Sequence, residues 1–117
     1  MKYKREIYEV MKDVGVSPDK LGYKYSGFII NEILTNDPES MTTLYNKAAE
    51  EFNSTYVRVE RCIRHCVECA FIHTDTDTLN KYFGNCITTK SGKVANGAFL
   101  YSIAEYIKAY ILKENFS

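Results

Sequence analysis

Residues 53–71 read NSTYVRVERCIRHCVECAF, and this stretch carries the clearest pattern in the chain. At about 100° per residue, its side chains separate onto two faces of a helix. One face gathers small or apolar residues: Val59, Cys62, Ile63, Cys66, Cys69 and Ala70. The other gathers polar and charged residues: Arg58, Arg61, Arg64, His65 and Glu68. The pattern predicts a long amphipathic helix with an arginine-rich outer face.

A shorter helical pattern comes just before this stretch, over residues 43–52. Asn53 joins the two patterns, and asparagine tolerates the left-handed backbone conformation that a tight turn needs. Two helices joined in this way, with arginines on the outer face of the second, are typical of a helix-turn-helix, whose second helix lies in the DNA major groove. We therefore expect a helix-turn-helix at about residues 42–72. The same periodicity also fits an ordinary helical hairpin in a bundle.

The rest of the chain shows apolar periodicity that predicts four further helices and no convincing strand. These helices are expected over residues 3–14, 21–35, 76–83 and 97–114, with a loop at 85–95. Thr42 or Thr43 is expected to cap the helix before Asn53, and Asn96 to cap the last helix. Gly27 lies inside a predicted helix, where a close packing contact would explain a glycine.

The composition is that of an ordinary globular protein. The 117 residues, 45% of them hydrophobic, are expected to form one all-α domain of six helices. No run is long and apolar enough to span a membrane, and no signal peptide is recognisable, so we expect a cytoplasmic protein with four reduced cysteines. The net charge is zero, although the acidic residues cluster largely away from the arginine face.

The arginine face holds the candidate DNA contacts. Three arginines recur at i, i+3 and i+6: Arg58, Arg61 and Arg64. Arginine bonds guanine through both arms of its guanidinium group, and a glutamate such as Glu60 accepts from a cytosine amino group. An exposed Val57 would contact a thymine methyl group, and His65 would donate to a phosphate. The alternative is a solvated face with Glu60 and Arg64 as an i, i+4 ion pair.

The cysteines raise the alternative of a zinc site. Three thiols at i, i+4 and i+7, with His65 and His73 nearby, are ligand types that zinc accepts. However, all three fall on the apolar face, where a free cysteine behaves as a small hydrophobic residue. We therefore interpret them as core residues and expect no metal and no cofactor. No arrangement of nucleophile and base stands out, so an enzyme is not expected.

The stretch from Leu44 to Phe71 closely resembles the helix-turn-helix of the C-terminal effector domain of the stage zero sporulation protein A family. This family contains the response regulator that starts endospore formation in Gram-positive bacteria. The most specific match is Arg58-Val59-Glu60-Arg61 followed by Ile63-Arg64-His65. Supporting matches extend over nearly the whole chain and include Phe52-Asn53, Phe83-Gly84, Lys93, and Asn96 with Phe99. The domain of that family has six helices.

The resemblance implies sequence-specific binding to double-stranded DNA as a transcription regulator. It assigns base reading to Arg58 and Glu60, a base or backbone contact to Arg61, and phosphate contacts to Arg64 and His65. Thr55, Tyr56 and Val57 at the helix tip, with Lys93 before the last helix, complete the expected contacts. The resemblance also implies contact with an RNA polymerase sigma factor and pairing of two copies, as a homodimer or head to tail on DNA. Since no run could span a membrane, no membrane partner is expected.

Three departures from the family pattern affect these expectations. Tyr56 and Val57 replace small residues at the helix tip, so the preferred operator is expected to differ. Residues 74–82, in the region that helps contact the sigma factor, match poorly. If Met1 is the native start, no receiver domain is expected. The altered residues 74–82, the expected lack of a receiver domain and the zero net charge support an alternative: a protein-interaction module that keeps the fold and modulates a full-length sporulation regulator without reading DNA.

Overall fold

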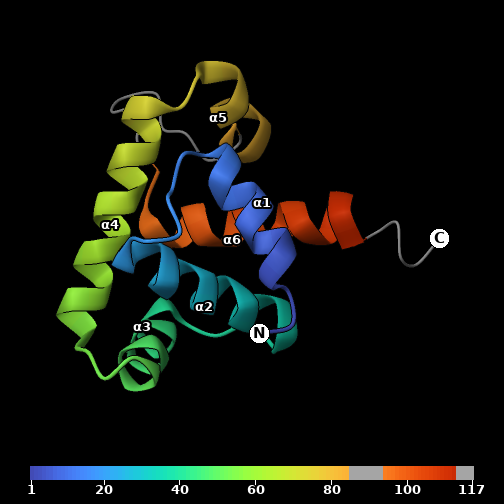
Figure 1. The fold of residues 1–117 in the computed structure, drawn as a ribbon. Helices are drawn as coiled ribbons and strands as arrows, with labels where there is room; N and C mark the ends of the chain where they lie inside the picture. Colours follow the sequence, from blue (N-terminus) through green and yellow to red (C-terminus); the bar gives the residue numbers. More distant parts are fainter. Residues whose placement is uncertain (85–93, 113–117) are drawn as a thin grey trace.

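The computed structural model describes residues 1–84 and 94–112. These ranges form α1 (Lys4–Asp13), α2 (Leu21–Thr35), α3 (Met41–Glu51), α4 (Tyr56–His73), α5 (Thr76–Phe83), α6 (Asn96–Tyr106) and a short π-helix η1 (Ile107–Ile111) (Figure 1). No strand occurs within them, which confirms the all-α prediction. None of these helices combines the length and the apolar character needed to cross a membrane. The expected loop at 85–95 lies largely outside the described ranges.

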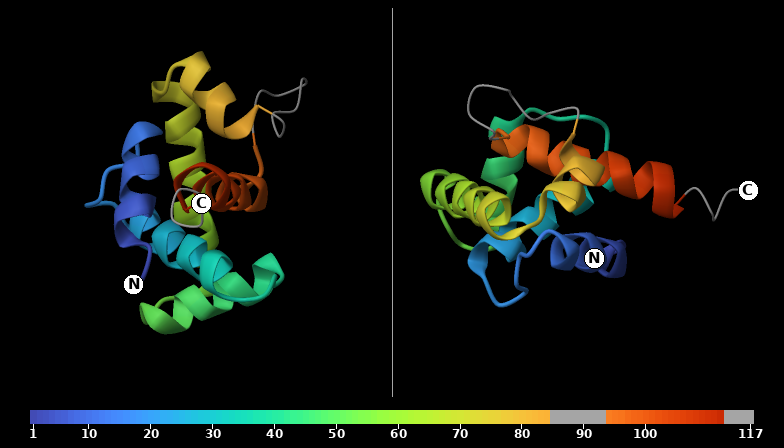
Figure 2. Two further views of the ribbon diagram at one scale, coloured as in Figure 1. Left: turned by 90° about the vertical axis from the view of Figure 1, so that its right-hand side faces the viewer. Right: turned by 90° about the horizontal axis from the view of Figure 1, so that it is seen from above.

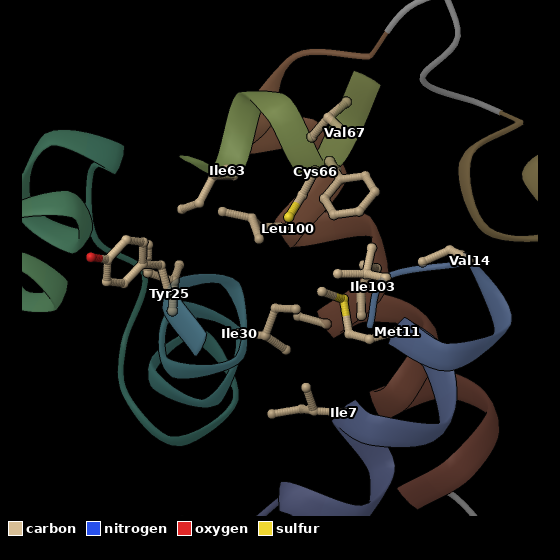
Figure 3. Packing of buried hydrophobic residues seen from close by; sticks show 14 of the residues in the cluster. Ile7, Met11, Val14, Tyr25, Ile30, Ile63, Cys66, Val67, Leu100 and Ile103 are labelled. Carbon is tan, nitrogen blue, oxygen red and sulfur yellow. The ribbon is translucent and has the colours of Figure 1, made fainter. Parts of the chain in front are cut away.

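One hydrophobic core joins the helices. α2 packs against both α4 and α6, α1 lies against α2, and α3 lies against α4. Figure 3 shows how side chains from α1, α2, α4 and α6 meet there, among them Met11, Ile30, Ile63 and Ile103. All four are fully buried, and burying such a side chain contributes about 1.5–3 kcal/mol to stability. The core therefore fixes α4 by its inner face alone.

The last helix is less regular than the sequence predicts. We expected one α-helix over 97–114, but α6 ends at Tyr106 and the chain continues as η1. The apolar stripe of this segment assigns Phe99, Ile103, Ile107 and Ile111 to the core. The first three are fully buried, whereas Ile111 is only half-buried. A π-helical turn is wider than an α-helical turn, so it shifts the direction of the residues that follow it.

The helix caps differ from the prediction at two places. Ser40 caps α3, because its side chain accepts a hydrogen bond from the Thr43 backbone N–H, so the expectation of Thr42 or Thr43 was wrong. Ala95 occupies the N-cap position of α6, and Asn96 is already helical. The Asn96 side chain therefore does not cap the helix and bonds elsewhere.

The close contact between helices occurs at Gly22 and not at Gly27. A Cβ atom added at Gly22 would lie 2.1 Å from Cys66 Sγ and 2.7 Å from the backbone oxygen of Cys62. At Gly27 the nearest atom would be Ile7 Cγ2, at an ordinary 3.7 Å. Gly22 thus lets the backbones of α2 and α4 approach each other directly.

Candidate nucleic-acid interface

The turn between α3 and α4 is tight and well bonded. Asn53 has a positive φ of 51°, as the sequence predicts. The Ser54 backbone N–H donates to the Ala49 carbonyl at 2.7 Å, and the Tyr25 hydroxyl donates to Ser54 Oγ at 3.2 Å. These bonds tie the turn to both α3 and α2, so the direction in which α4 leaves the turn is fixed.

Phe52, just before the turn, lies nearer the surface than expected. The apolar pattern of residues 43–52 assigns Phe52 to the buried face, but its side chain is 38% exposed. One edge of the ring still packs on α2, with centroid distances of 5.5 Å to Tyr25 and 5.8 Å to Phe28. The ring therefore supports the turn from its side without entering the core.

The two faces of α4 are those that the sequence predicts. The outer face is exposed and consists of Arg58, Arg61, Arg64, His65 and Glu68. The inner face includes Val59, Ile63, Cys66 and Ala70, all buried. Cys62 and Cys69, expected in the core, are only half-buried at the border between the faces. The helix lies along one edge of the molecule (Figure 2, right), and its three arginines are exposed to solvent.

The tip of α4 presents Thr55, Tyr56 and Val57. The Thr55 side chain caps the helix by accepting from the Arg58 backbone N–H at 3.2 Å. The Tyr56 ring meets the Tyr45 ring edge-on at 5.1 Å, which holds it against α3. Val57 is 58% exposed with an apolar side chain at the surface. Thr55 and Tyr56 are thus held in place, whereas Val57 is open to a partner.

Glu60 and Arg64 form an ion pair along the outer face. Arg64 Nη1 lies 3.2 Å from Glu60 Oε1, as in the i, i+4 alternative that the sequence left open. The Arg64 side chain is 54% exposed and the Glu60 side chain 28%. An exposed pair of this kind contributes only about 0.3–0.5 kcal/mol, so a phosphate can replace the carboxylate at little cost. Lys93, the remaining expected contact, lies outside the described residues.

Asn96 joins three helices behind the arginine face, a role that the sequence analysis missed. Its Nδ2 donates to the Tyr45 hydroxyl on α3 and to the Glu60 backbone carbonyl on α4, each at 3.2 Å. Burial raises the pKa of Tyr45, so the hydroxyl stays neutral. Because Tyr45 also contacts Tyr56, this junction reaches the tip of α4.

The cysteines of α4 do not form a metal centre in the structure. Across the described ranges, no three His, Cys, Asp or Glu side chains converge on a possible metal position. Burial raises the pKa of the Cys66 thiol to about 11, as expected of a core cysteine. Cys69 instead faces His65, with Sγ 3.5 Å from Nε2.

An all-α fold in which a short turn leads into an edge helix with exposed arginines is compatible with the DNA-binding domains of transcription regulators. Residues 7–107 match the protein family described as "Sporulation initiation factor Spo0A C terminal". The match covers most of the 117-residue chain, and the chain belongs to this family. The family is the DNA-binding effector domain of a sporulation regulator.

Proposed function

We propose that the chain binds a specific double-stranded DNA sequence as a transcription regulator, with α4 in the major groove. The observation that carries this proposal is the exposed row of Arg58, Arg61 and Arg64 on an edge helix whose other face is held in the core. An α-helix fits the width of the major groove, and exposed guanidinium groups reach base edges and phosphates there.

The residues near the tip of α4 are proposed to read bases. Arg58, in the first turn, is the best placed for a two-armed bond to guanine, and Val57 offers an apolar contact to a thymine methyl group. Tyr56 and Thr55 have positions fixed by Tyr45 and by the helix cap, so they would approach the DNA without rearrangement. Arg61, one turn further on, would contact a base or the backbone.

Farther along α4, Arg64 and His65 are proposed to contact phosphates. Arg64 would exchange the Glu60 carboxylate for a phosphate oxygen, which frees Glu60 to accept from a cytosine amino group. Each phosphate neutralised in this way releases counterions, so binding should weaken as salt rises. Since the chain has no net charge, we expect weak attraction to arbitrary DNA and a larger share of affinity from base contacts.

The decisive experiment is a mobility-shift titration of the wild-type protein and Arg58→Ala. The DNA carries either the family's operator element or a scrambled sequence of equal length. We expect tighter binding to the operator, and a loss of about 1–3 kcal/mol for Arg58→Ala on the operator alone. Arg5→Ala is the matched control, because it removes the same charge from α1, away from the outer face of α4 (Figure 2).

Equal weak binding to both DNA sequences, unchanged in Arg58→Ala, would overturn specific recognition. It would favour the alternative function, a module that binds a full-length sporulation regulator through protein contacts. Contact with an RNA polymerase sigma factor and head-to-tail pairing on DNA stay predictions drawn from the family resemblance.

A further inference from the structure

A groove of about 770 Å³ runs along one flank of α4, between this helix and residues 15–22. Its wall includes the three thiols of Cys62, Cys66 and Cys69 together with the imidazole of His65. Arg61 and Lys20 add two positive charges. Asp19, the one carboxylate among the described lining residues, accepts a hydrogen bond from the Ser17 hydroxyl. The groove therefore combines soft nucleophiles with a positive field.

The three thiols of the groove differ in accessibility and in neighbours. Cys66 is buried, and its raised pKa of about 11 leaves almost no thiolate at neutral pH. Cys62 and Cys69 are both half-buried, so small reagents can reach them. Cys69 Sγ lies 3.5 Å from His65 Nε2, within hydrogen-bond reach. A thiol paired with an imidazole is the arrangement that activates a cysteine as a nucleophile.

We propose that Cys69 is a modification site, at which the thiol forms a mixed disulfide with an anionic low-molecular-weight disulfide. His65, in the tautomer that carries its hydrogen on Nδ1, accepts the proton from Sγ. The thiolate attacks one sulfur of the disulfide, a new S–S bond forms, and the original S–S bond breaks. The leaving thiolate takes the proton from the His65 imidazolium and departs as a thiol. The Cys69 sulfur is oxidised and the departing sulfur is reduced.

We expect the mixed disulfide on Cys69 to persist, because the neighbouring Cys66 thiol attacks it only slowly. Cys66 lies at i, i+3 from Cys69, and helix geometry places the two Cα atoms roughly 5 Å apart, a distance that a disulfide spans. Attack by Cys66 would need its thiolate, which burial disfavours. Cys62 is seven residues away, roughly 10 Å along the helix, which is too far for a disulfide.

The positive charges of Arg61 and Lys20 favour an anionic reagent over a cationic one. An adduct on Cys69 would place negative charge beside His65, one of the proposed DNA contacts, and in the groove that Arg61 also lines. This consequence rests on the proposed function: modification should weaken DNA binding several-fold by repelling phosphates. The chemistry at Cys69 itself does not depend on DNA binding.

The test treats the full chain with glutathione disulfide at neutral pH, and peptide mass spectrometry follows each cysteine separately. We expect Cys69 to be modified several-fold faster than Cys62, and Cys66 to stay unmodified. Cystamine, a cationic disulfide, should react more slowly with Cys69. His65→Gln should lower the rate at which Cys69 is modified several-fold and leave the rate at Cys62 unchanged. Equal rates at Cys62 and Cys69, or no effect of His65→Gln in a variant with wild-type circular dichroism, would overturn the proposal.

A separate measurement links the modification to DNA. Wild type and Cys69→Ser are titrated with operator DNA before and after glutathione disulfide. A several-fold loss of affinity in wild type, absent in Cys69→Ser, supports the link. Unchanged affinity of the modified wild type overturns the link alone, since the reaction rates decide the chemistry independently.

Discussion

The side-chain amide of Asn96 on α6 donates a hydrogen bond to the backbone carbonyl of Glu60 on α4, with Nδ2 and O 3.2 Å apart. The carbonyl lies in the first half of α4, directly behind the exposed arginines. The same nitrogen donates to the Tyr45 hydroxyl on α3. Asn96 is therefore the residue through which α6 fixes the distance between the two helices that form the candidate interface.

Replacing Asn96 with alanine should destabilise the protein by about 1–2 kcal/mol, because two part-buried hydrogen bonds are lost. Urea unfolding followed by circular dichroism measures this change. Asn80→Ala, at an exposed position of α5, is the matched control and should change stability by less than about 0.5 kcal/mol. If both variants unfolded at the same urea concentration as wild type, the junction would have no energetic role.

Gly22→Ala should be strongly destabilising, by about 1–3 kcal/mol or more. The new methyl group would meet Cys66 Sγ at 2.1 Å and the Cys62 backbone oxygen at 2.7 Å, so α2 and α4 must separate. Gly27→Ala, in the same helix, makes only ordinary contacts, to Ile7 at 3.7 Å and Met1 at 4.0 Å, and should be neutral or stabilising by up to about 1 kcal/mol. Thermal unfolding compares the stability of the two variants directly. Equal changes in stability would contradict the close crossing of α2 and α4 at Gly22.

Tyr82→Phe should remove about 1 kcal/mol of stability at neutral pH, because the Tyr82 hydroxyl donates to Asp13 Oδ2 at 2.5 Å. Burial, followed by the Asp13 carboxylate, raises the pKa of Tyr82 above its usual value near 10. A raised pKa means that this stabilisation is complete below about pH 10 and is lost as the pH rises through the folded-state value.

Urea unfolding at pH 7 and at several pH values above 10 tests this expectation for Tyr82. The difference in stability between wild type and Tyr82→Phe should shrink as the pH rises above 10. Tyr8→Phe, at a 41% exposed position, should differ little from wild type at neutral pH. A difference for Tyr82→Phe that stayed constant as the pH rose would contradict the raised pKa of the Tyr82 hydroxyl in the folded protein.

Glu60→Gln should change stability by no more than about 0.5 kcal/mol, since the ion pair with Arg64 is exposed. It should nevertheless strengthen binding to scrambled DNA, because it removes a negative charge from the interface and frees Arg64 for a phosphate. Mobility shifts on scrambled DNA at low salt measure this gain. Glu9→Gln, on α1, removes an equal charge elsewhere and should produce a smaller gain.

The sequence predicts the helices well because each one buries a regular stripe of apolar residues. On α4 the period of 3.6 residues assigns Val59 and Ile63 to the core and Arg58 and Arg61 to solvent, and the structure agrees. The left-handed Asn53 is likewise a local property of the chain. Such features are determined within a few residues and do not depend on partners far away in the sequence.

The features that the sequence does not predict depend on long-range contacts. Asn96 looks like a helix cap from its neighbours, but its amide finds partners 36 and 51 residues away. The sequence directed attention to Gly27, whereas the close contact lies at Gly22, because the crossing of α2 and α4 cannot be seen from neighbouring residues. The pairing of Cys69 with His65 is local, yet its relevance comes from the groove that residues 15–22 complete.

The contact of backbone on backbone at Gly22 has a consequence for how binding preference changes in evolution. Because the Cys66 side chain and the Cys62 backbone oxygen lie so close to Gly22, any larger residue at position 22 would shift α4 relative to α2. A change of binding preference is therefore expected to come from the exposed side chains of α4, since these can be exchanged without disturbing the crossing at Gly22.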